Sequence, residues 1–235
     1  EKNIKKKIAD LTVIIMAGGK GTRMKPFTNV LPKPLIPIGG VTAIEKILNN
    51  FKEYGLKNFI LSINEKSEII KAFFHELMGK YKVKFVQEKK PLGTVGSLKI
   101  INKKYLKSDM LVTNCDVIVN FDLLDFYNFH KDNKFDITIV ASDKKYDIPY
   151  GVCEISKDGT LKNISEKPSY DFFISIGFYL FSKKVLDIIP KNKHFDANQL
   201  IASAKKKRFK IGIFPIRDDN WSDVGQWSEF KSIKL

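Results

Sequence analysis

Short apolar runs alternate with segments of helical periodicity over the first 142 residues of this chain. The apolar runs have the length and composition of buried strands, and the segments between them repeat apolar residues every three or four positions, as amphipathic helices do. The expected strands cover residues 12–17, 57–63, 82–87, 109–115 and 136–142, and the expected helices cover 42–54, 66–78, a segment starting near 94, and 121–133. This alternation predicts an α/β fold, a Rossmann-like three-layer sandwich with a mostly parallel mixed sheet.

The pattern changes after Tyr146, where short strands follow one another without intervening helices. Consecutive strands of this kind favour a small antiparallel extension of the main sheet. The expected elements are strands at 150–156, 160–166 and 173–181, helices at 183–189 and 196–206, a strand at 208–216 and a final helix at 225–233. We therefore expect one domain over residues 11–235, preceded by a basic linker over residues 1–10.

The composition narrows the classes of function. A net charge of +15 would ordinarily indicate a nucleic-acid partner. The lysines are scattered, however, and their excess accompanies many Ile, Asn and Phe residues, which is the bias of an AT-rich coding sequence. We therefore expect a solvated lysine surface and no nucleic-acid partner. With two cysteines and no apolar run of membrane-spanning length, we expect a cytoplasmic protein without a membrane partner.

A glycine-rich loop, AGGKGTR over residues 17–23, follows the first expected strand. Its glycines allow the backbone N–H groups to approach phosphate oxygens closely. It is not a P-loop, which needs Gly-Lys-Ser/Thr, and Met24 stands where a dinucleotide fingerprint has its third glycine. The glycines alone also fit a flexible turn. Arg23 adds a fork of donors suited to phosphate, and two prolines stiffen the backbone around Lys33.

Two aspartates are candidates for a metal site. Asp116 ends an apolar strand, and Asp223 lies in a tryptophan-containing turn far along the chain. Strand ends at one edge of an α/β sheet are where ligands bind, and Mg²⁺ takes one or two carboxylates together with substrate phosphates. Taken alone, each aspartate also fits a helix cap or a turn.

The strings AGGKGTRMKPFT and LPKPL resemble the N-terminal motif of sugar-1-phosphate nucleotidyltransferases. Further matches follow in that family's order, at Gln87, 91–94, 114–116, 149–152, 166–168, 175–177 and 221–225. The resemblance implies Mg²⁺-dependent transfer of a nucleoside monophosphate from a triphosphate to a sugar 1-phosphate, with release of pyrophosphate. Within the family, the chain looks most like guanylyltransferases of bacterial surface-sugar pathways with CBS regulatory domains upstream, such as the glucosamine-1-phosphate enzyme of legionaminic acid synthesis.

The resemblance also assigns roles to individual residues. It implies that Arg23, Lys33, Asp116 and Lys167 are catalytic and that Asp116 and Asp223 hold Mg²⁺. It implies nucleotide contacts from Ala17, Gly18, Gly19, Gly21, Thr22, Gln87, Gly93 and Thr94. It implies sugar contacts from Tyr150, Gly151, Glu166, Ser175 and Gly177. Ser175 departs from many relatives, which have Asn there, so the sugar is less well defined than the reaction. The partners implied are a nucleoside triphosphate and a sugar 1-phosphate, with room for a homo-oligomer and for an upstream CBS domain.

The base is predicted from strand alternation and the resemblance together. Alternation places Val83, Phe85 and Gln87 on one face of their strand, so we expect Gln87 to reach a base beside the glycine loop. Gln87 serves uracil or thymine as well as guanine, and uridylyl, cytidylyl and thymidylyl transfer stay open. The resemblance favours GTP and glucosamine 1-phosphate. Two other classes, a nucleic-acid-binding protein and a catalytically dead regulator, remain alternatives. The histidines at 75, 130 and 194 are expected at surface or packing positions.

Overall fold

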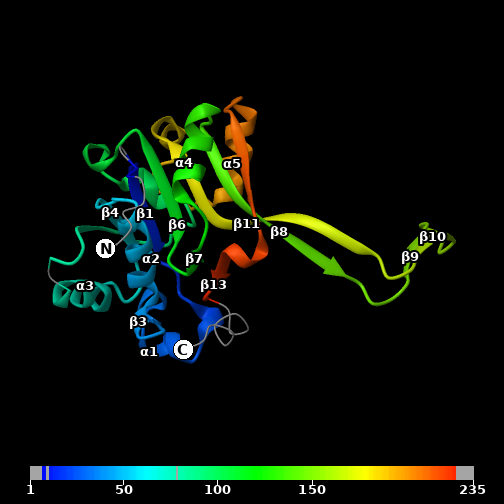
Figure 1. The fold of residues 1–235 in the computed structure, drawn as a ribbon, viewed down its shortest axis with the longest axis horizontal. Coiled ribbons are helices and arrows are strands. Elements are labelled where there is room, and N and C mark those ends of the chain that lie inside the picture. Colours follow the sequence, from blue (N-terminus) through cyan, green and yellow to red (C-terminus); the bar gives the residue numbers. More distant parts are fainter. Residues whose placement is uncertain (1–6, 9–10, 78, 226–235) are drawn as a thin grey trace.

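The computed structural model describes residues 7–8, 11–77 and 79–225, and its centre is a seven-stranded sheet (Figure 1). The strand order is β12 (Ile211–Ile216), β8 (Ile137–Asp147), β11 (Ser169–Ser182), β6 (Asp109–Asn114), β1 (Leu11–Ala17), β4 (Phe59–Ile63) and β5 (Val83–Gln87). β11 runs antiparallel to both of its neighbours, and all other neighbours in the sheet are parallel. The mostly parallel mixed sheet is therefore confirmed. Most of the expected linker and of the helix at 225–233 lies outside the described residues.

Helical elements cover both faces of the sheet, which gives the expected three layers. In β1, Val13 and Ile15 point into one core, while Ile14 points into the other, as strand alternation requires. The first core lies under α2 (Ala43–Glu53), α3 (Ser67–Glu76) and α4 (Leu123–Asp132); the second lies under α5 (Ala197–Lys206) and the 3₁₀ helices η3 (Gly96–Ile100) and η5 (Lys183–Asp187). Each core is made almost entirely of aliphatic and aromatic side chains, so the sheet is a rigid base for its loops.

Three expected elements differ in kind or in place from those in the structure. The segment near 94 forms the 3₁₀ helix η3 and not an α-helix; it begins at Gly96, and glycine is a poor helix former. The helix expected at 183–189 is also a 3₁₀ helix, η5. The strand expected at 173–181 is the second half of β11: its first residues lie on a two-stranded ribbon with β8, and from Phe178 onward it lies inside the main sheet. Phe178 and Leu180 fill one core and Phe181 the other, and such two-sided burial is typical of an interior strand.

β8 and β11 continue past the sheet as a two-stranded ribbon. β12 pairs with β8 only as far as Ser142, and β6 pairs with β11 only from Phe178 onward. Beyond these points Asp143–Asp147 pairs with Ser169–Phe173 alone. The ribbon carries the hairpin of β9 (Val152–Ile155) and β10 (Leu161–Ser165), and Figure 1 shows it projecting away from the body of the molecule. Residues 143–174 are called the arm below.

One short strand pair was not expected. β7 (Val117–Val119) directly follows the turn after β6 and pairs antiparallel with β13 (Trp221–Asp223). The pairing aligns Asp223 with Val117 and so brings a late segment of the chain to the carboxyl end of the central sheet. No helix among the described residues is long and apolar enough to cross a membrane.

Candidate active site

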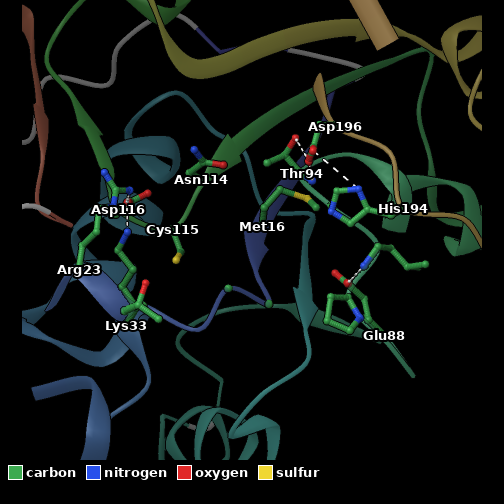
Figure 2. Close-up of a pocket in the computed structure, with 17 residues that line it drawn as sticks. Met16, Arg23, Lys33, Glu88, Thr94, Asn114, Cys115, Asp116, His194 and Asp196 are labelled. Carbon is green, nitrogen blue, oxygen red and sulfur yellow. Dashed lines mark hydrogen bonds and ion pairs between the residues drawn. The ribbon is translucent and has the colours of Figure 1, made fainter. Parts of the chain in front are cut away.

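A pocket of about 430 Å³ opens at the carboxyl ends of β1 and β6 (Figure 2). It is lined by Met16, Gly18, Gly19, Gly21, Thr22, Arg23, Lys33, Glu88, Pro91, Leu92, Gly93, Thr94, Asn114, Cys115, Asp116, His194 and Asp196. Figure 2 shows two ends: Arg23 and Lys33 meet Asp116 at one, and Glu88, Thr94, His194 and Asp196 gather at the other. The structure therefore brings together nine of the residues expected from sequence, at the sheet edge where α/β proteins bind ligands.

The glycine loop has little room for side chains. Gly21 has φ +64°, and a Cβ there would lie 2.8 Å from the Cγ2 of Thr28. The Thr28 hydroxyl donates to the Gly21 carbonyl at 2.8 Å and fixes the turn. A Cβ on Gly18 would lie 3.1 Å from Glu88 Oε1, so the absence of a side chain here lets the loop pass close to Glu88. The side chain of Ala17, by contrast, is buried in the first core and does not line the pocket.

Asp116 and Asp223 meet beside the two cations. The Lys33 ammonium contacts Asp116 Oδ2, and the Arg23 guanidinium lies 3.5 Å from Asp223 Oδ2 and 4.0 Å from Asp116 Oδ2. The Val224 amide donates to the Asp116 carbonyl at 3.0 Å, next to the β7–β13 pairing. The two carboxylates are 7% and 12% exposed, whereas the Arg23 side chain is 61% exposed. The cluster is thus a pair of nearly buried carboxylates in contact with two cationic side chains.

Burial and the neighbouring Asp223 raise the pKa of Asp116, while the Lys33 ammonium opposes that rise. Two carboxylates this close need positive charge to ionise together. Within the described part of the chain no three His, Cys, Asp or Glu side chains form a metal cluster. A pair of carboxylates nevertheless fits Mg²⁺, which completes its octahedral shell with phosphate oxygens and water.

Gln87 does not line the pocket, although the sequence placed it there. Its side chain donates to the Ser67 hydroxyl at 3.1 Å and accepts from Lys71 at 2.9 Å, so it faces α3 and not the pocket. Val83 and Phe85 pack on that same face, so the alternation was right but its assignment to the pocket was wrong. Alternation shows which residues share a face and cannot show that a helix covers it.

Glu88, the next residue, lines the pocket instead. It is only 6% exposed; Oε1 accepts from the Ser62 hydroxyl at 2.8 Å, and Oε2 accepts from the Leu92 amide at 2.9 Å. These two bonds fix the carboxylate between the end of β4 and the loop that holds Gly93. The sequence signal was available, because the residue after Gln87 necessarily points to the opposite face.

Residues just before α5 complete this end of the pocket. The Thr94 amide donates to Asp196 Oδ1 at 2.9 Å, and the Ala197 amide donates to the Thr94 hydroxyl at 2.8 Å. Gly93 has φ +78°, and a Cβ there would lie 2.8 Å from the Phe195 carbonyl oxygen. His194 lines the pocket beside them, although the sequence placed it at a surface or packing position.

The residues expected to contact the sugar do not line the pocket. Tyr150, Gly151, Glu166 and Lys167 all lie on the arm, and Tyr150 is 74% exposed. Glu166 and Gly151 lie together there, since a Cβ on Gly151 would be 3.2 Å from Glu166 Oε2.

Gly177 and Ser175 lie closer to the main sheet. Gly177, with φ +80°, borders the pocket: a Cβ there would lie 2.5 Å from Nδ2 of the pocket residue Asn114. The Ser175 hydroxyl is within 3.2 Å of the Tyr179 hydroxyl. Of the expected sugar residues, Gly177 therefore lies at the rim of the pocket and the arm residues lie away from it.

The fold and the site together define a class: an α/β protein whose glycine loop, two cations and two carboxylates surround a pocket at the carboxyl end of the sheet. The sequence profile of the nucleotidyl transferase family matches residues 12–235, and the chain belongs to that family.

The named relatives include several guanylyltransferases. The chain is 32% identical to a mannose-1-phosphate guanyltransferase of Yarrowia lipolytica, over 93% of this chain and 62% of the relative. It is 29% identical to D-glycero-alpha-D-manno-heptose 1-phosphate guanylyltransferase of Campylobacter jejuni, over 92% of this chain and 95% of the relative. HddC from Yersinia pseudotuberculosis, solved in complex with GMP-PN, is 27% identical with a TM-score of 0.71, over 94% of this chain and 97% of HddC. The chain spans about three fifths of the mannose-1-phosphate relatives.

Proposed function

We propose that this chain transfers a nucleoside monophosphate, GMP by preference, from its triphosphate to a sugar 1-phosphate and releases pyrophosphate. The observation that carries the proposal is the meeting of Asp116 and Asp223 with Arg23 and Lys33, beside a glycine loop whose backbone is open to the pocket. Phosphoryl-type transfer depends on positioning and on neutralising negative charge, and this cluster supplies both.

In this mechanism an oxygen of the sugar phosphate attacks the α-phosphorus in line, and pyrophosphate leaves. No general base is required, because a phosphate monoester with a second pKa of about 6 is already largely dianionic at neutral pH. Arg23, with its exposed side chain, would bind the departing pyrophosphate, and Lys33 would orient the attacking phosphate. Asp116 and Asp223 would hold Mg²⁺, which neutralises the charge that the two substrates bring together.

Glu88 supports guanine as the base. Guanine presents two donors on one edge, N1–H and N2–H₂, and a carboxylate presents only acceptors. Glu88 accepts one hydrogen bond on each oxygen already, which leaves a lone pair on each oxygen for the base. Uracil and thymine would place a carbonyl oxygen beside this carboxylate, and a mismatch of buried polar groups discriminates strongly. The guanylyltransferase names of the relatives point the same way.

For the identity of the sugar, we propose several candidates and not one. Glucosamine 1-phosphate follows from the resemblance of the sequence motifs, whereas the named relatives act on mannose 1-phosphate and on a heptose 1-phosphate. A further relative, 30% identical, is a probable glucose-1-phosphate cytidylyltransferase of Bacillus subtilis, so CTP with glucose 1-phosphate is the second candidate pair.

Pyrophosphate release with each triphosphate and each sugar phosphate tests the proposal. GTP, UTP, CTP, ATP and dTTP are assayed against glucosamine, mannose, heptose and glucose 1-phosphates in Mg²⁺. We expect the largest kcat/KM with GTP. A preference for CTP with glucose 1-phosphate would replace guanylyl by cytidylyl transfer, and no release with any pair would refute the reaction itself.

Replacing Glu88 by Gln tests whether Glu88 selects guanine as the base. One acceptor oxygen becomes a donor, so we expect kcat/KM for GTP to fall by roughly 10²-fold or more while the poorer triphosphates change little. Glu76→Gln, at an exposed position on α3, is the matched control. Thermal unfolding of each variant shows whether the fold is kept. An unchanged ratio of GTP to UTP in a folded Glu88→Gln enzyme would show that another group selects the base.

A further inference from the structure

The arm exposes an unusual amount of apolar surface. Its exposed large apolar side chains are Tyr146, Tyr150, Ile155, Leu161, Ile164, Tyr170, Phe172 and Phe173. Phe172 lies against both Tyr146 and Tyr170, with ring centroids 6.0 and 6.4 Å apart, so part of this surface is one aromatic cluster. A two-stranded ribbon is barely stable alone in water, and contiguous exposed apolar surface marks an interaction site. The arm therefore has the character of a surface that another molecule covers.

The arm also holds the groups that the pocket lacks. Every residue that lines the pocket comes from outside the arm, while Lys167 and Glu166 lie beyond the far end of the ribbon. Gly177, at the root of the arm, touches the pocket residue Asn114. Lys167 precedes Gly177 by ten residues, and an extended strand of that length spans roughly 30 Å. In Figure 1 the arm points away from the body, with β9 and β10 at its far end. Lys167 closely follows β10 in the chain, so this spacing places it far from the pocket of its own chain.

The ribbon is not built to turn back on itself. Its antiparallel pairs run unbroken from Ser142 with Ile174 to Asp147 with Ser169. The one irregularity in this β8–β11 ladder lies at the root, between Ser175 and Tyr179. A sharp bend within the ribbon, which would be needed to bring its tip back toward the body, would break this ladder and leave backbone groups unpaired, which is costly.

A hollow at the root offers a place for another arm. It has a volume of about 440 Å³ and an apolar floor made by Phe121, Phe214 and Ile216. Asp122, Asp125 and Arg217 also line it, together with Asp143 and Phe173 from the root of the arm. An arm exposes aromatic and aliphatic side chains of the same kind, so the hollow and an arm are complementary in polarity.

We propose that two copies of this chain exchange arms and that each arm completes the sugar-phosphate end of the partner's pocket. Two arms lying antiparallel across a two-fold axis place the tip of one beside the root of the other, and the root borders the pocket. Lys167 and Glu166 then act in trans: Lys167 binds the sugar phosphate, and Glu166 accepts hydrogen bonds from sugar hydroxyls. This inference rests on the proposed function, since it assigns these residues to the sugar phosphate of that reaction.

Complementation between two inactive variants tests the exchange. Lys33→Ala damages the pocket and keeps the arm; Lys167→Ala damages the arm and keeps the pocket. Each variant alone should lose roughly 10²-fold or more of its rate, as expected for a lost charge contact to a transferring phosphate. The two chains, tagged differently, are coexpressed, and the mixed dimer is purified through both tags. One of its two sites then combines an intact pocket with an intact arm, so we expect about half of the wild-type rate. A mixed dimer no more active than its parents would overturn the proposal.

The oligomeric state gives a second, independent readout. Sedimentation equilibrium should show a wild-type dimer, and Phe172→Ser should dissociate it and lower the activity together. Ile69→Ser, at an exposed position on α3, is the matched control and should do neither. A fully active wild-type monomer would also overturn the exchange. If complementation fails while the wild type is active, the exchange is refuted and the proposed function stands. If no substrate pair gives activity, the proposed function is refuted. The sedimentation result then tests the contact between arms by itself.

Discussion

Single residues at the pocket are constrained in different ways. Gly21 and Gly93 combine positive φ with neighbours that would collide with a Cβ, so backbone geometry selects them. Asp116 is selected by charge, since its carboxylate is buried among Lys33, Arg23 and Asp223. Cys115 lies between these groups, but burial raises the pKa of its thiol to about 12, so it is a neutral packing group and not a nucleophile.

Replacing either aspartate by Asn should remove most of the activity. Asp116→Asn and Asp223→Asn each take away one negative ligand, and we expect kcat to fall by roughly 10²–10³-fold at saturating substrate, with a larger Mg²⁺ requirement. Mn²⁺ binding followed by electron paramagnetic resonance measures the metal directly. Asp132→Asn, on the exposed end of α4, is the control, and circular dichroism verifies the fold. Near-normal activity and Mn²⁺ binding in both variants would show that the metal lies elsewhere.

For single residues, the sequence predicted which residues meet at the site better than it predicted where each side chain points. The motif order led to Arg23, Lys33, Asp116 and Asp223, and the structure places these four side chains together. The direction of Gln87 could not be derived, because it depends on α3 packing over one face of β5. His194 was missed for a similar reason, since its place in the pocket depends on where α5 begins in space.

Among the secondary-structure elements, the long ones could be predicted from the sequence and the shortest ones could not. β1, β4 and β6 are continuous apolar runs and were expected within two residues of their ends. α2 was equally clear because its apolar residues repeat at helical spacing, and the structure adds a capping box of Thr42 with Glu45 at its first turn. β7 and β13 have three residues each, which is too short for any periodicity, and their pairing depends on the sheet that is already formed.

The start of β6 contains a buried acid that should control acid stability. Asp109 is 4% exposed and accepts from Lys131 at 2.7 Å, with the His130 ring nearby. Burial alone would raise the pKa of Asp109, but His130 and Lys131 hold it below its usual range. A carboxyl with a lowered folded-state pKa stabilises the protein above the unfolded-state pKa, about 3.9, and this contribution is lost as the pH falls through the folded-state pKa.

We therefore expect Asp109→Asn to lower the free energy of unfolding at pH 7 by about 1–3 kcal/mol and to flatten its decline below about pH 4. Urea unfolding at pH 7, 5, 4 and 3 measures both effects. Asp132→Asn serves as the surface control on the neighbouring helix. Parallel curves for the wild type and Asp109→Asn would show that this acid does not contribute to the acid sensitivity.

For the molecule as a whole, the sequence predicted the layers and a small antiparallel extension, but not the long ribbon that carries the extension. The alternation of strands and helices implied a sheet covered on both faces, and two separate cores confirm it. The small antiparallel extension was predicted, and the hairpin of β9 and β10 confirms it. The continuation of β8 and β11 beyond the sheet, which carries this hairpin, was not visible, because most residues from Tyr170 to Phe181 are apolar both inside the sheet and on the arm. From the sequence alone, an apolar side chain that is buried in the core cannot be distinguished from one that is exposed on the surface.

The net charge of +15 belongs to this scale too, and we expect it to give only weak and nonspecific binding of nucleic acid. Each phosphate contact lowers the affinity by about 0.9 log units per tenfold rise in salt, so binding through scattered lysines should vanish near physiological salt. Fluorescence anisotropy with a labelled DNA duplex and an RNA hairpin, from about 20 to 200 mM salt, measures this. Tight, sequence-selective binding at about 150 mM salt would revive a nucleic-acid function.

The pairing of β13 with β7 has a consequence for how the protein matures. Translation proceeds from the N-terminus, so the glycine loop, Asp116 and all seven strands of the sheet are synthesised before Asp223. A nascent chain that has reached β12 can assemble both cores while still lacking its second carboxylate. The order of synthesis thus separates folding from activity: the sheet and its helices can form first, and the two carboxylates that we propose to hold Mg²⁺ come together only when the last described strand is added.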